Sequence, residues 1–116
     1  MKDNIVQDKS YAFSLRIIKL HQFLKSENQY EIASQILRSG TSIGANVEEA
    51  IGGQSRRDFL HKLSISYKEA RETKYWLRLL KDSEIVDLET SNSYIDDCEE
   101  LLRILGSIQK SLKANS

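Results

Sequence analysis

The chain has 116 residues, enough for one domain that buries an apolar core without disulfide or metal support. It carries 17 basic and 17 acidic residues, so net charge favours no class of charged partner, and only the distribution of charge can do so. The single cysteine, Cys98, excludes an intramolecular disulfide. There is also no signal-peptide pattern and no run near the ~18 apolar residues of a membrane span, so we expect a cytoplasmic protein with no membrane partner.

Four stretches carry apolar residues at helical spacing, and no proline interrupts them. We predict helices over about residues 7–25, 29–51, 55–82 and 87–113. The connections are short, which favours antiparallel neighbours. The predicted fold is therefore an all-α, antiparallel up-down-up-down four-helix bundle, with one domain over residues 1–116.

The first predicted helix is apolar on two faces. One face carries Phe13, Ile17, Leu20 and Leu24, and the nearly opposite face carries Tyr11, Leu15 and Ile18. No helix of a four-helix bundle is central, so the second face needs a cover from outside the chain. We therefore predict an oligomer interface at Tyr11, Leu15 and Ile18. Trp76 lies opposite the main apolar stripe of the third predicted helix and belongs either to a second core face or to a subunit contact; we add it to the interface because tryptophan is enriched at such contacts.

The second predicted helix contains two glycines four residues apart, Gly40 and Gly44, and ends at Gly52 and Gly53. Each mid-helix glycine costs up to ~1 kcal/mol relative to alanine, so some other interaction should offset it. Close approach of a neighbouring helix is one interpretation. A phosphate-binding loop is the other, but the segment lacks a preceding strand and a Gly-Lys-Ser/Thr sequence.

The third predicted helix begins at a capping-box pattern, Ser55-x-x-Asp58, and carries four cations on one side. This basic stripe consists of Arg57, Lys68, Arg71 and Arg78, with Tyr75 on the same side. Cations interleaved with an aromatic ring suit phosphate binding and base stacking, so these five residues are the candidate nucleic-acid site. Alternatively, the stripe pairs with residues 82–100, which hold eight acidic residues and no basic one.

Several polar residues lie at the margins of the second and third helices. We predict that Asn46, Glu49, Glu69 and Glu72 form a structural polar network between these helices. The chain has no Glu-x-x-His pattern of the kind that di-iron bundles use, so we expect neither a metal nor another cofactor. In the fourth helix, which we start at an Asp87 N-cap, Cys98 is expected to be a buried small hydrophobe.

Arg56 and His61 are spaced as Arg-x4-His. This spacing resembles the motif of HEPN-type ribonucleases, in which histidine and arginine act on the 2′-hydroxyl and the scissile phosphate. The other interpretation is a solvated helix start.

Two long stretches, residues 36–50 and 58–80, carry the patterns Arg-Ser-x-x-Ser-Ile-x-Ala-Asn and Lys-Glu-Ala-x-Glu-Thr-x-Tyr-Trp-Leu. They resemble the bacterial four-helix-bundle proteins named for the 23S rRNA intervening sequence, also called the ribosomal-protein-S23 type. The resemblance implies a four-helix subunit that forms a ring, typically a homopentamer with a central channel. It also implies kinship with the accessory protein of diversity-generating retroelements, which binds a reverse transcriptase and nucleic acid through a basic surface.

Three hypotheses follow for function. The first is a non-enzymatic, homo-oligomeric interaction module, with RNA or a nucleic-acid-processing protein as partner. The second is a HEPN-like, metal-independent ribonuclease that uses Arg56 and His61. The third is a regulatory partner of another gene product.

Overall fold

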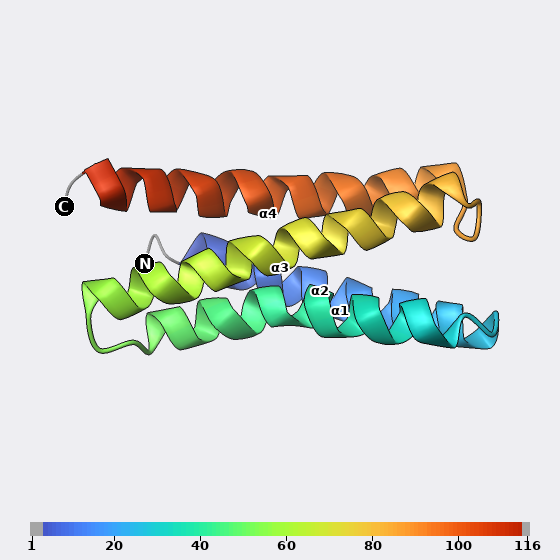
Figure 1. Ribbon diagram of the computed structural model, residues 1–116, viewed down its shortest axis with the longest axis horizontal. Helices are drawn as coiled ribbons and strands as arrows, with labels where there is room; N and C mark the ends of the chain where they lie inside the picture. The colour runs from blue at the N-terminus through green and yellow to red at the C-terminus, as the bar shows by residue number, and fades with distance from the viewer. Residues whose placement is uncertain (1–3, 115–116) are drawn as a thin grey trace.

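The computed structural model describes residues 4–114, which form four α-helices (Figure 1). Their bounds are Asn4–Ser26 for α1, Tyr30–Ile51 for α2, Arg56–Asp82 for α3 and Leu88–Ala114 for α4. All four predicted helices are present, and no helix end differs from its prediction by more than three residues. The predicted all-α four-helix bundle is confirmed.

The helices alternate in direction along a rod of 46 × 21 × 20 Å. The α1–α2 and α3–α4 turns share one end, and the α2–α3 connection lies at the other end with the start of α1 and the end of α4 (Figure 1). The backbone of α2 packs against α1 and α3, while the contact between α1 and α4 is the sparsest. Within residues 4–114, α1 and α3 are not neighbours, so they occupy diagonal corners of the bundle.

The apolar stripes read from the sequence form the core. Its most deeply buried members come from all four helices: Ile17 and Leu24, Ile36, Ile43 and Val47, Leu63 and Leu77, and Cys98, Leu101 and Leu105. Full burial of one large aliphatic side chain stabilises a fold by about 1.5–3 kcal/mol, whereas an exposed ion pair contributes about 0–1 kcal/mol. The core therefore decides stability, and the charged residues are free to serve other purposes.

The glycine pair of α2 lies where α1 approaches most closely. A methyl group on Gly40 would sit 2.8 Å from two side-chain carbons of Ile17, and one on Gly44 would sit 3.2 Å from the Ser10 backbone oxygen. Neither position has room for a larger side chain. Close helix approach, the first of the two interpretations, is confirmed. The phosphate-loop interpretation is wrong because both glycines are buried within a continuous helix.

Capping side chains start the two later helices, as predicted. Ser55 Oγ accepts a hydrogen bond from the Asp58 backbone nitrogen at 3.0 Å. Asp87 Oδ1 accepts one from the Thr90 backbone nitrogen at 2.8 Å, and this bond lowers the pKa of the Asp87 carboxyl. The caps fix where α3 and α4 begin, and with that the positions of the charged residues along each helix.

Candidate nucleic-acid interface

The basic stripe lies on an exposed face of α3. All four of its cations are exposed, and none forms an ion pair with any residue in the range 4–114. From Arg57 to Arg78 the stripe extends about 30 Å along the helix, at a rise of about 1.5 Å per residue. The charges are therefore available to a partner outside the chain.

The acidic stretch of residues 82–100 pairs with other cations instead. Glu99 accepts a hydrogen bond from Lys74 at 2.9 Å, and this bond lowers the pKa of the Glu99 carboxyl. Two further pairs join α4 to α1, Arg16 with Asp97 at 2.5 Å and Lys9 with Glu100 at 3.2 Å. Pairing between the basic stripe and α4 is thus not formed within the chain.

Tyr75 stands on the same face as the stripe, with 51% of its surface exposed. Its ring makes an edge contact with Trp76, with ring centroids 5.3 Å apart and planes inclined by 63°. Trp76 itself is half-buried and packs against the core, and its Nε1 donates to Glu72 Oε2 at 3.0 Å. The exposed tyrosine is thus supported by a tryptophan that its own helix holds in place.

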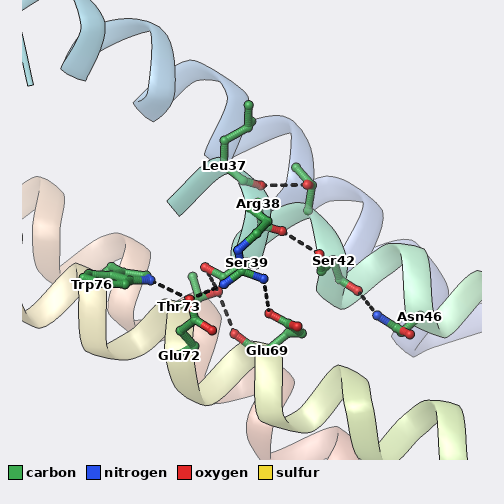
Figure 2. Close-up of polar contacts among 10 residues, drawn as sticks. Leu37, Arg38, Ser39, Ser42, Asn46, Glu69, Glu72, Thr73 and Trp76 are labelled. Carbon is green, nitrogen blue, oxygen red and sulfur yellow. Dashed lines mark hydrogen bonds and ion pairs between the residues drawn. The ribbon is translucent and has the colours of Figure 1, made fainter. Parts of the chain in front are cut away.

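Arg38 of α2 contacts Glu72 of α3, the residue that also accepts the hydrogen bond from Trp76, as Figure 2 shows. Its guanidinium group donates to Glu69 Oε1 at 3.2 Å and forms a second, short contact with Glu72 Oε2. The hydrogen bond between Arg38 and Glu72 raises the pKa of the arginine and lowers that of the glutamate, so both stay charged at neutral pH. We call Arg38, Glu69 and Glu72 the Arg38 cluster.

The predicted four-residue network is therefore wrong for Asn46, and its three glutamates form two separate ion-pair groups between α2 and α3. Asn46 Nδ2 donates to the Ser42 carbonyl of its own helix at 2.8 Å, and so does not reach α3 (Figure 2). Glu49 does link α2 to α3, but through a separate ion pair with Lys62 at 2.7 Å. Sequence reasoning placed Glu69 and Glu72 correctly at the α2–α3 junction and missed Arg38, which joins them.

Buried hydroxyl groups also connect α2 and α3. Thr73 Oγ1 donates to Ser39 Oγ at 2.9 Å, and Ser66 Oγ donates to the Ile43 carbonyl at 2.8 Å. All three hydroxyl-bearing residues are fully buried. These bonds satisfy polar groups that would otherwise be costly in the core, and they fix how the two helices face each other.

The second apolar face of α1 is exposed in the single chain. Tyr11, Leu15 and Ile18, the α1 outer face, are exposed by 63%, 49% and 39%. Beside them a groove of about 370 Å³ runs between α1 and α2, with Thr41, Gly44 and Ala45 among its lining residues. Trp76, the fourth predicted interface residue, lies elsewhere, in a groove next to Ile32 of α2.

The two residues of the ribonuclease hypothesis diverge. Arg56 Nη2 donates to the Leu112 carbonyl of α4 at 3.1 Å, while His61 is exposed. Five residues along an α-helix correspond to a rotation of about 140° between side chains. Within one copy of the chain, the two side chains are therefore turned apart along α3.

The sequence also matches a known family. The family model described as "23S rRNA-intervening sequence protein" matches residues 2–107. The chain belongs to this family. The resemblance carried by residues 36–50 and 58–80 is thereby confirmed.

A solved structure supports the same assignment. The chain is similar to a protein of unknown function from the S23 ribosomal protein family of Bacteroides thetaiotaomicron. The two chains share 50% identity with a TM-score of 0.91, over 95% of this chain and 99% of the other. No curated protein matches the chain.

Cys98 is the one cysteine of the chain and lies in α4. Burial raises the pKa of the Cys98 thiol to about 12, and its Sγ donates to the Ala70 carbonyl at 3.2 Å. The residue is fully buried, as expected for a small hydrophobe.

Residues 4–114 contain no cluster of three or more His, Cys, Asp or Glu side chains suited to a metal, and none of the helices in that range could span a membrane.

Proposed function

We propose that this protein is a non-enzymatic, homo-oligomeric interaction module of the cytoplasm that binds RNA through the basic stripe of α3. The observation that carries the proposal is that all four cations of the stripe are exposed and have no ion-pair partner within residues 4–114. Cations aligned along one helix suit a phosphate backbone, because binding releases the counterions that the phosphates hold. The family name, which refers to 23S rRNA, supports RNA as the nucleic acid.

Self-association is assigned to the α1 outer face. Its three large apolar side chains are exposed and adjoin a groove lined by small residues of α2. A second copy that covered this face would remove apolar surface from water, at about 25 cal/mol per Å². Because α1 and α3 occupy diagonal corners, assembly through α1 leaves the basic stripe of each copy open.

RNA binding is tested by fluorescence anisotropy of a labelled structured RNA, titrated with the protein over a salt series. If each cation of the stripe contacts one phosphate, the logarithm of the affinity should fall with the logarithm of salt concentration with a slope of about −3. Arg71→Ala should make the slope shallower by about one, since it removes one phosphate contact. Lys19→Ala, which removes an exposed cation of α1, is the matched control. No binding even at low salt would refute the proposal.

Self-association is tested by measuring the mass of the protein in solution with light scattering. Leu15→Glu should reduce the mass to that of a smaller species, because it places a charge on the α1 outer face. Leu88→Glu is the matched control, because Leu88 is also an exposed leucine but lies at the start of α4. A wild-type protein that is monomeric at every concentration tested would rule out the oligomeric part of the proposal.

A further inference from the structure

We infer that Tyr75 is a stacking platform for an unpaired base, so that the basic stripe binds single-stranded segments of RNA in preference to duplex. This inference rests on the proposed function, because it names the form of RNA that the same surface takes. It depends on three features of the ring: where it stands, what holds it, and what it could reach on each form of RNA.

Tyr75 stands between two cations of the stripe. Arg71 precedes it by four residues and Arg78 follows it by three, so all three side chains lie on one side of α3. The two arginines are separated by about 10 Å along the helix axis. That span corresponds to about three nucleotides of a stacked strand, at about 3.4 Å each. A base on the ring would thus have a phosphate within reach of an arginine on either side.

The ring is held before any ligand arrives. Trp76 contacts it at a centroid separation of 5.3 Å, and the indole of Trp76 is fixed by its hydrogen bond to Glu72. Glu72 is in turn paired with Arg38 across the helix junction (Figure 2). An aromatic side chain fixed in this way loses little further freedom when a base stacks on it. Half of the tyrosine surface nevertheless remains accessible.

Duplex RNA cannot use this platform. In an A-form duplex the bases stack on each other, and the major groove is too deep and narrow for side chains to read. The arginines could still contact the phosphates of a duplex, but Tyr75 would find no open base face. An unpaired loop or strand offers both a phosphate chain and a free base, so the ring contributes only to that form.

The test measures the anisotropy of two labelled RNAs, one a single strand and the other a blunt-ended duplex of the same length with no unpaired base, against wild type and three variants. Tyr75→Leu should weaken single-strand binding about tenfold, the magnitude expected for one lost base–aromatic stack, and should change duplex binding little. Tyr75→Phe should retain wild-type affinity. Phe23→Leu is the matched control, because Phe23 is an exposed aromatic residue of α1, and α1 is not a neighbour of α3.

A second readout does not depend on any variant. Single-stranded RNA carrying 2-aminopurine should lose fluorescence on binding the wild-type protein, because stacking on Tyr75 quenches the base. Salt-sensitive RNA binding with no quenching and no effect of Tyr75→Leu would overturn this inference and leave the proposed function standing. Failure of both RNAs to bind at all would overturn the inference and the proposed function together.

Discussion

Gly40 offers the sharpest test of how the bundle is packed, through the substitution Gly40→Ala. The added methyl carbon would lie 2.8 Å from Ile17 Cγ1 and Cγ2 and 3.0 Å from its Cδ1, well inside the 3.5–4.0 Å (roughly) of an ordinary carbon contact. Ile17 is fully buried and branched at Cβ, so it cannot turn aside cheaply. Overpacking of this kind typically costs about 1–3 kcal/mol, against a gain of about 1 kcal/mol from helix propensity. We expect a net loss of about 1 kcal/mol.

Gly106 provides the comparison for the same chemical change. A methyl group there would sit 3.4 Å from Tyr67 Cε1, an ordinary contact, so Gly106→Ala should gain up to about 1 kcal/mol from helix propensity. Urea unfolding followed by circular dichroism at fixed protein concentration measures both variants. Equal or greater stability of Gly40→Ala relative to Gly106→Ala would refute the packing argument.

A double-mutant cycle locates the clash. Ile17→Ala alone should cost about 2–5 kcal/mol, because it leaves a cavity in the core. It also removes all three atoms that the new methyl group would meet at Gly40. In the Ile17→Ala background, Gly40→Ala should therefore become stabilising, and the coupling between the two sites should exceed about 1 kcal/mol.

Three further predictions concern individual side chains. Native Cys98 should not react with a thiol reagent until the protein unfolds, because burial raises its thiol pKa to about 12, and rapid native labelling would contradict this. Arg38→Ala should lower the free energy of unfolding, measured by urea denaturation, by about 0.5–1 kcal/mol. Asn46→Ala should lower it by less, because Asn46 bonds only its own helix, and the reverse order would count against the Arg38 cluster. Hydrogen bonds hold the pKa values of the Glu72 and Asp87 carboxyls below their ordinary 4.5 and 3.8. The contribution of these two carboxylates to the stability of the fold is therefore complete above about pH 4.5 and is lost as the pH falls. A Tm that stays constant from about pH 6 to pH 3 would argue against both bonds.

The helices themselves could be predicted because spacing alone records which residues face the core. Ile36, Ile43 and Val47 recur at intervals of seven and four residues, and all three are fully buried. The capping side chains Ser55 and Asp87 marked where α3 and α4 begin. These signals are local in the chain, and no knowledge of the partner helix is needed to read them.

The polar junction between α2 and α3 could be predicted only in part, because it depends on how one helix is rotated against the other. Glu69 and Glu72 stand at the margin of the α3 stripe, but nothing in the spacing identifies Arg38 as the residue opposite them. Asn46 occupies a similar margin on α2 and turns back to its own backbone instead. Thr73 could have been found, since it interrupts the α3 apolar stripe at helical spacing, a sign of a buried hydroxyl group.

The unpaired cations of α3 also affect how the protein behaves at a distance. The chain as a whole is electrically neutral, while exposed acidic residues gather at the α3–α4 turn, among them Asp82, Glu84 and Glu89. A neutral body with separated charges has a dipole moment, and a polyanion exerts a torque on it before any contact is made. The molecule should therefore approach with the α3–α4 turn facing away from the polyanion and the basic stripe of α3 facing toward it. Salt screens charges beyond about 10 Å, so added salt should weaken this orienting effect.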